Sequence, residues 1–353
     1  MDQLSDRPEP LDLLSLSLEE LRAYLVGLGQ PSYRADQLYG WMYKGRAFDE
    51  MTNLPAPLIA LLKEKALCTL PAVTKKLVSQ IDGTVKFLFT LYDGQPIESV
   101  VMFYEHGISI CISTQAGCRM GCKFCASTLN GKDRDLLPSE MLGQIIVAQR
   151  EIGQRISNVV LMGIGEPLDN YDNVLKFLHL LGDEKGLCIG QRHVSLSTCG
   201  LADRIRQLSK EKLQITLSIS LHAYSDEKRS ELMPVNRKWN LNELLGACAE
   251  YFAATGRRIS FEYTLIEGVN DQPDGAKRLA LLLKRYMGDM PVHVNLIPVN
   301  PVKERGFVKS GVNAVEAFRK VLSDHGINAT VRRKLGSDIN ASCGQLRHES
   351  KNC

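Results

Sequence analysis

The feature that most constrains the fold is an alternation of short apolar segments with longer helical patterns, which begins after Ile108. In the longer segments, apolar residues recur every three or four positions, as on one face of a helix. Strands joined through helices lie parallel in one sheet. The sequence therefore predicts an α/β fold of about six β/α units, either doubly wound or curled into a partial barrel, with ligands at the strand carboxyl ends. The candidate strands are Ser109–Ser113, Val159–Met162, Val194–Leu196, Ile215–Ile219, Ile259–Tyr263 and Val292–Ile297, followed by Thr330–Arg332.

The N-terminal part differs, because its apolar residues recur at helical spacing with no strand between the runs. One helix is predicted after Ser17, which can form a capping box with Glu20. Two further helical runs follow Pro31 and Pro57. We therefore expect residues 1–72 to form a small helical accessory domain.

Residues 73–104 change to a period of two, in which Val85, Phe87 and Phe89 alternate with polar neighbours. Asp93-Gly94 then marks a turn toward a second apolar run. This pattern predicts a short β-hairpin that links the helical domain to a core spanning residues 105–330. The remaining residues, 331–353, form a C-terminal segment.

The composition restricts which partners and which cellular compartment we expect for this chain. The 353 residues carry a net charge of +3, so any contact with nucleic acid depends on local basic clusters. No apolar run approaches the roughly 18–20 residues that span a bilayer, and the start of the chain lacks a signal peptide. We expect a cytoplasmic protein with no membrane partner. Its ten cysteines, at scattered spacings, favour metal binding or catalysis over a disulfide framework.

The strongest motif is Cys118-Arg-Met-Gly-Cys122-Lys-Phe-Cys125, which follows the first core strand. Three thiolates can hold three corners of a [4Fe–4S] cluster and leave one iron open for a substrate or cofactor. The alternative is zinc, which three cysteines and a water or a distant fourth ligand would also hold. Closed zinc sites usually use two separated cysteine pairs, and no second CxxC occurs here.

This motif, at the end of the first strand of a β/α array, resembles the signature of the radical S-adenosylmethionine (SAM) superfamily. The resemblance implies a partial (β/α)6 radical SAM barrel that binds one [4Fe–4S] cluster and SAM. Further matching stretches make the chain similar to the bacterial family of dual-specificity RNA adenine-C2 methyltransferases. They include Gly163-Ile-Gly165-Glu166-Pro167-Leu168, Ser197-Thr198-Cys199-Gly200, Ser220-Leu221-His222, Asn295-Leu-Ile-Pro-Val-Asn300-Pro301 and Gly336-Ser-Asp-Ile-Asn-Ala-Ser-Cys343.

Carried over motif by motif, the resemblance implies a set of SAM-binding residues at successive strand ends. A carboxylate suits the methionyl ammonium, and small residues let the cofactor approach the backbone. Each residue alone has an ordinary structural explanation, such as a tight turn or a core histidine. The implied set is Gly165, Glu166, Ser197, Ser220, Leu221, His222 and Asn300.

The resemblance also implies the mechanism. One SAM methylates Cys343, and a radical derived from a second SAM activates that methyl group for addition to the adenine. Cys111 then resolves the covalent RNA–protein adduct by forming a disulfide with Cys343, and Glu98 matches a proposed proton acceptor. The implied partners are 23S rRNA, tRNA and an electron donor such as flavodoxin or ferredoxin.

Basic residues near these motifs are candidates for phosphate contacts, although such runs are often only solvated surface. They are Arg332, Arg333, Lys334, Arg347 and Lys351 around Cys343, and Lys132 and Arg134 after the cysteine motif.

Two other functions stay open. One is the related C8-adenosine rRNA methyltransferase of the antibiotic-resistance type, and the other is an iron–sulfur electron carrier or RNA-binding sensor without a SAM pocket.

Overall fold

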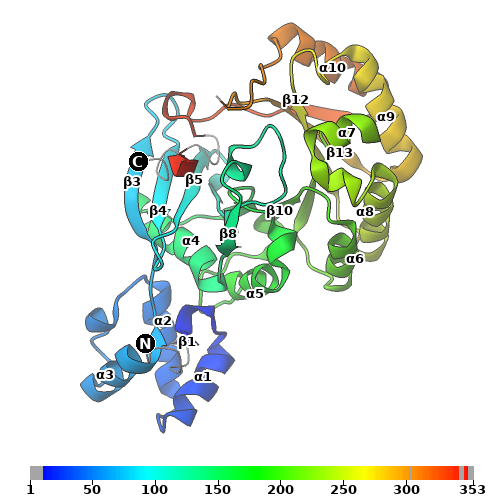
Figure 1. Ribbon diagram of the computed structural model, residues 1–353. Coiled ribbons are helices and arrows are strands. Elements are labelled where there is room, and N and C mark those ends of the chain that lie inside the picture. Colours follow the sequence, from blue (N-terminus) through cyan, green and yellow to red (C-terminus); the bar gives the residue numbers. More distant parts are fainter. Residues whose placement is uncertain (1–10, 303, 342–345, 349–353) are drawn as a thin grey trace, which may run out of the picture.

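The computed structural model describes residues 11–302, 304–341 and 346–348, and its centre is one ten-stranded sheet (Figure 1). The strands lie in the order β14-β13-β12-β11-β10-β9-β6-β5-β4-β3, and from β6 to β14 all neighbours are parallel. The parallel strands are β6 (Gly107–Cys111), β9 (Asn158–Leu161), β10 (Val194–Thr198), β11 (Thr216–Ser220), β12 (Ile259–Leu265), β13 (Val292–Pro298) and β14 (Asn328–Val331). The α/β prediction is confirmed. Within the described residues β14 and β3 are the edges, so the sheet is open.

Helices connect the parallel strands and run along the outer side of the curved sheet (Figure 1). Their apolar faces are buried against it; in α4, for example, Met141, Leu142 and Ile145 are fully buried. This one-sided arrangement leaves the inner face of the sheet for polar residues. The helices are α4 (Pro138–Ile152), α5 (Tyr171–Leu181), α6 (Ala202–Lys210), α7 (Asp226–Leu232), α8 (Leu241–Thr255), α9 (Pro273–Met287) and α10 (Val312–Asp324).

The N-terminal part is helical, as predicted, with α1 (Leu18–Gly27), α2 (Tyr33–Tyr43) and α3 (Ala56–Lys65) forming a separate group in Figure 1. The capping box forms: Ser17 Oγ accepts from Glu20 N, and Glu20 accepts from Ser17 N. Two short parallel strands, β1 (Leu11–Asp12) and β2 (Ala66–Leu67), join the two ends of this group.

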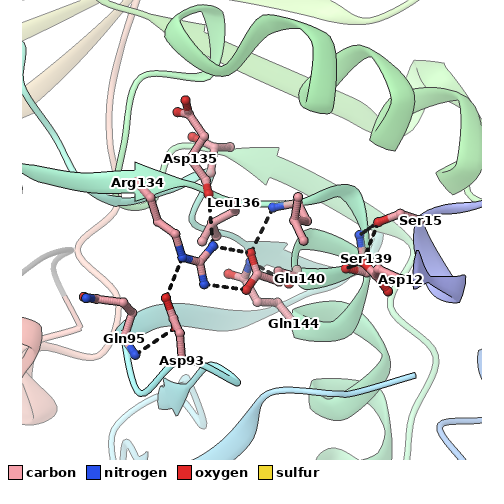
Figure 2. Close-up of polar contacts among 12 residues, drawn as sticks. Asp12, Ser15, Asp93, Gln95, Arg134, Asp135, Leu136, Ser139, Glu140 and Gln144 are labelled. Carbon is pink, nitrogen blue, oxygen red and sulfur yellow. Dashed lines mark hydrogen bonds and ion pairs between the residues drawn. The ribbon is translucent and has the colours of Figure 1, made fainter. Parts of the chain in front are cut away.

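Polar contacts fix the helical group to the core at the start of α4 (Figure 2). The Ser139 backbone amide donates to Ser15 Oγ at 3.0 Å, and the Ser139 hydroxyl donates to Asp12. Beside them, Arg134 donates from Nη1 and Nη2 to Glu140, both at 2.7 Å, and from Nε to Asp93 at 2.6 Å. The start of α4 is thereby joined to both the helical group and the turn of the hairpin.

The predicted hairpin is formed by β4 (Val85–Thr90) and β5 (Pro96–Tyr104), with Gly94 at φ +82° in its turn. It extends the core sheet, because β5 pairs antiparallel with β6 and places Val100 opposite Cys111. A further strand, β3 (Ala72–Val78), pairs with β4 on the outside. No helix among the described residues is long and apolar enough to cross a membrane.

Candidate active site

The cysteine motif occupies a loop that is closed at its base by a small antiparallel hairpin, β7 (Gln115–Gly117) and β8 (Lys132–Asp135). The Cys118 amide donates to the carbonyl of Gly131 at 2.8 Å. Gly117 has φ +88°, and a Cβ there would lie 2.1 Å from the Gly131 carbonyl oxygen, so only glycine fits. On the other side, the Lys123 amide donates to Leu232 O at the end of α7. The loop is therefore held in shape by the backbone on both sides.

Two cysteines of the motif, Cys118 and Cys122, are buried, and Cys125 is half-buried. Burial raises the pKa of the Cys118 thiol to about 12 and that of Cys122 well above its usual value, and the neighbouring thiols, Cys125 included, add to both shifts. Over the described residues, no three His, Cys, Asp or Glu side chains converge closely enough to hold a single metal ion. A cubane cluster binds each cysteine through a different iron and so requires a wider spacing than one ion. A loop that carries three neighbouring thiols, two of them buried and one half-buried, fits such a cluster.

Gly165 and Glu166 follow β9, where the chain passes very close to the start of the cysteine loop. Gly165 has φ +112°, and a Cβ there would lie 2.7 Å from the backbone nitrogen of Gln115. Glu166 is 3% exposed and accepts hydrogen bonds from the backbone amides of Leu168 at 3.0 Å and Cys199 at 2.7 Å. Burial raises the pKa of Glu166, against the effect of these hydrogen bonds. Its carboxylate thus joins the ends of β9 and β10.

Ser197 and Ser220 lie at the carboxyl ends of β10 and β11, two neighbouring strands of the parallel sheet. After Ser220 the chain turns sharply, and Leu221 and His222 both donate their backbone amides to the carbonyl of Glu262. These strand ends are therefore held together by hydrogen bonds across the sheet.

His222 adopts the left-handed conformation, with φ +57°. Its Nδ1 accepts from the Thr264 amide at 2.9 Å, and its ring packs edge-on against Phe124 of the cysteine loop, with 4.8 Å between ring centroids. Burial, and then the charge of Arg229, lower the pKa of His222 to about 3. The imidazole is therefore neutral at physiological pH.

Arg229 is a buried residue of the site that sequence analysis missed. It lies on α7 within Asp226–Leu232, a run of mostly charged residues that is typical of a solvated helix, so no local signal could have found it. Yet its side chain is 0% exposed and donates to the carbonyls of Cys199, Ser220 and Leu221. It connects the strand ends that carry the predicted SAM-binding residues.

A cavity of about 470 Å³ opens beside β5 and β6. Cys111 and Asn300 both line it, together with the stretch from Val331 to Ser337 and with Asn340 and Ala341. Exposed cations also line it, namely Lys309, Arg332, Arg333 and Lys334. The structure thus brings the predicted resolving cysteine, one predicted SAM-binding residue and three of the predicted phosphate contacts to a single cavity.

Glu98 lies on β5, on the same face as Val100 of the cavity wall, and is 1% exposed. It pairs with Lys86 at 3.0 Å and accepts from the backbone amide of Arg347 at 2.6 Å. Cys343 lies outside the described residues, as do Lys351 and the disulfide expected between Cys343 and Cys111.

The other predicted phosphate contacts have partners within the protein. Lys132 pairs with Asp135 and Asp169, and Arg134 pairs with Glu140 and Asp93 (Figure 2). Arg347 is 2% exposed and donates to Asp133 and to the carbonyl of Pro96. These three cations are therefore engaged within the protein, whereas the four cations of the cavity are exposed.

Comparisons with known proteins agree with this arrangement. Residues 112–280 match the Radical SAM superfamily, and residues 11–68 match the ribosomal RNA large subunit methyltransferase N-terminal domain. The chain is similar over 95% of its length to a radical SAM methyltransferase from Sphaerobacter thermophilus, with 41% identity, a TM-score of 0.90 and 99% of that chain covered. The superfamily implies a [4Fe–4S] cluster and SAM as cofactors.

Curated relatives of this chain carry the name probable dual-specificity RNA methyltransferase RlmN, and two of them serve as examples. The protein from Clostridium botulinum is 53% identical, with 95% of this chain and 96% of that protein covered. The protein from Lachnospira eligens is 52% identical, with 96% of each covered. This similarity extends over nearly the whole chain, through the helical group, the cysteine loop and the strand ends. The chain therefore belongs to the RlmN family of dual-specificity RNA methyltransferases, within the radical SAM superfamily.

Proposed function

We propose that this enzyme methylates C2 of a specific adenosine in the peptidyl-transferase region of 23S rRNA and of the adenosine 3′ of the anticodon in some tRNAs. The observation that carries the proposal is the cavity that Cys111, Asn300 and the chain just before Cys343 line together. A volume of about 470 Å³ is within the range of small-molecule sites and is sufficient for one unstacked base.

In this proposal Cys118, Cys122 and Cys125 hold the cluster, and the strand-end residues from Gly165 to Asn300 hold SAM. When bound, these groups supply the methyl group and the one-electron chemistry that an electron-poor ring carbon requires. The Cys343 thiol carries the methyl group. To release the product, the Cys111 thiol would attack the sulfur of Cys343: the disulfide forms, the bond between that sulfur and the carbon on the base breaks, and the carbon takes up the proton given up by the thiol, which completes the methyl group. Glu98 is the proposed proton acceptor, and its contact with the Arg347 amide supports a role beside Cys343.

The four exposed cations of the cavity are proposed to hold the phosphates that flank the target base. Such contacts fix the position of the nucleic acid, and the target base must leave its stack to reach the cavity. An electron donor such as flavodoxin or ferredoxin would reduce the cluster, and the proposed compartment is the cytoplasm.

The direct test is nucleoside mass spectrometry after reaction of the cluster-loaded enzyme with a 23S rRNA fragment and, separately, with tRNA. We expect 2-methyladenosine in both RNAs. Formation of 8-methyladenosine would show that the enzyme methylates C8 and not C2. Product in only one of the two RNAs would show that only that RNA is a substrate. A cluster-loaded protein that forms neither product and does not bind SAM would refute the proposal. The Cys118→Ala variant serves as the control without cluster.

A further inference from the structure

Arg229 is a fully buried cation, and within the described part of the chain none of its hydrogen-bond partners is a carboxylate. Its guanidinium donates to the carbonyls of Cys199 at 2.6 Å, Ser220 at 3.1 Å and Leu221 at 3.1 Å, and to the side-chain oxygen of Asn236 at 3.0 Å. All four acceptors are neutral. These hydrogen bonds engage all three nitrogens of the guanidinium but do not balance its charge.

The carboxylate in this network belongs to Asp226, which binds Asn236 and not the guanidinium itself. Asn236 donates to the carboxylate of Asp226 at 2.9 Å, so Asp226 reaches the guanidinium only through the amide side chain. A cation removed from water without a directly bonded anion is strongly unfavourable. Arg229 is therefore expected to have a further negative group nearby in the functional enzyme.

The cysteine loop lies against the helix that carries Arg229. The Lys123 amide donates to the carbonyl of Leu232 at 2.9 Å, which joins the loop to the end of α7. Arg229 lies one turn before Leu232 on the same helix, and Lys123 is the residue after Cys122. The buried cation and the loop of predicted cluster ligands are therefore joined through one backbone hydrogen bond.

We propose that Arg229 is a positioning residue whose buried charge is balanced by the [4Fe–4S] cluster and raises the reduction potential of that cluster. The inference rests on the proposed binding of the cluster by Cys118, Cys122 and Cys125. The cluster gains negative charge when it accepts an electron, so a fixed cation in a dry environment stabilises the reduced form more than the oxidised form. The same guanidinium holds the strand ends proposed to bind SAM, which couples the position of the cation to that of the cofactor.

The test is an anaerobic redox titration of the cluster-loaded protein without SAM, followed by electron paramagnetic resonance. Arg229→Lys keeps the charge and loses the forked geometry, whereas Arg229→Gln loses the charge and keeps amide donors. Arg206→Gln is the matched control, because Arg206 lies on the neighbouring α6 but pairs with Glu250 and is 41% exposed. Iron content is measured for every variant.

We expect Arg229→Gln to reduce the ratio of reduced to oxidised cluster at a fixed potential by about tenfold or more, equivalent to a shift of ~59 mV toward negative values for one electron. Arg229→Lys and the control should stay close to the parent protein. An unchanged potential in a fully loaded Arg229→Gln variant, or equal shifts in the Lys and Gln variants, would overturn the inference. If the Gln variant does not fold, a tenfold loss in Arg229→Lys overturns it and a retained potential supports it. Absence of the cluster signal in the parent protein would instead refute the proposed cluster site.

Discussion

Lys86 and Glu98 form an ion pair in the interior, with 3.0 Å between ammonium and carboxylate and side chains 0% and 1% exposed. Both residues also contact the C-terminal segment. Lys86 Nζ donates to the carbonyl of Asn340 at 3.0 Å, and Glu98 accepts from the Arg347 amide at 2.6 Å. The pair therefore contacts the described chain on both sides of Cys343.

Removing one member of this pair would leave the other charge buried without its counterpart. We expect Lys86→Met to lower the free energy of unfolding by about 3–5 kcal/mol, measured by chemical denaturation of the cluster-free protein. The double variant Lys86→Met/Glu98→Gln should lose less than the sum of the two single variants, because neither charge is then stranded. Lys176→Met is the control, since Lys176 and Glu20 form an exposed pair; an equal effect there would contradict the prediction.

The turn between β3 and β4 holds the C-terminal segment a second time. Asp82 accepts from the Gly336 amide at 2.8 Å, and Asp338 accepts from Ser79 Oγ at 2.7 Å and from the Gln80 amide at 2.8 Å. Burial acts to raise the pKa of Asp82, but the hydrogen bonds from Gly336 and Thr84 outweigh it and lower the pKa to about 2. The carboxylate is therefore ionised at neutral pH.

We expect Asp82→Asn to weaken this attachment, because the amide is a weaker acceptor than the carboxylate. Hydrogen exchange of the Gly336 and Ala341 amides should become several-fold faster, which corresponds to about 1 kcal/mol of local stability. RNA methylation should fall while iron content stays unchanged. Asp324→Asn, at an exposed pair on α10, is the control; unchanged exchange in the Asp82 variant would show that the turn does not hold the segment.

Much of the fold was predictable from local patterns, because each parallel strand and the helix after it has its own periodicity. The hairpin of β4 and β5 was predicted too, but its pairing with β6 was not, since the edge of β6 carries no signal that selects a partner. Lys86 and Asn340 are separated by 254 positions, and no spacing rule relates them. The strand-end residues were identified by motif, and the structure adds the contacts that hold them.

His222 gives a prediction for pH dependence. Its pKa is about 3 in the folded protein, mainly because of burial, against about 6.5 in an unfolded chain. Below pH 6.5 the unfolded chain binds a proton that the folded protein excludes. The stability contributed by the neutral imidazole is therefore complete above pH 6.5 and is lost progressively as the pH falls toward 3.

The variant His222→Asn tests this, because asparagine tolerates the left-handed conformation and its Oδ1 can accept from the Thr264 amide in place of Nδ1. Between pH 7.5 and 5, the cluster-free parent protein should lose about 2 kcal/mol of stability relative to the variant. Denaturant titrations of both proteins across this range measure the difference. A difference in the free energy of unfolding that stays constant across this pH range would show that His222 can be protonated in the folded protein.

The proposed cluster ligands lead to a test on iron. Replacing Cys118, Cys122 or Cys125 with Ala leaves two thiolates, which are insufficient to retain a cubane cluster stably, so we expect each variant to lose both iron and methylation. Cys188→Ala is the control, because Cys188 is exposed and far from the motif in sequence. Retention of full iron and activity by any single variant of the three would exclude that cysteine as a ligand.

Substitutions of Cys343 and Cys111 should cause different defects. Cys343→Ala removes the proposed methyl carrier, so no methyl group is placed on the protein and no adduct forms; the variant should be inactive and free of bound RNA. Cys111→Ala keeps the carrier and enlarges the cavity that Cys111 lines, but removes the thiol that releases the product.

We therefore expect Cys111→Ala to purify with RNA that stays attached through Cys343 under denaturing conditions and is released only by nuclease. Mass spectrometry of the tryptic peptide that contains Cys343 would identify the attached nucleotide. The double variant Cys111→Ala/Cys343→Ala should carry no RNA, which tests the attachment site directly. RNA crosslinked to the Cys343 single variant, or no RNA on a cluster-loaded Cys111 variant, would contradict these roles. Cys199 and Cys248, which are buried and lie outside the motif, would then be the next candidates.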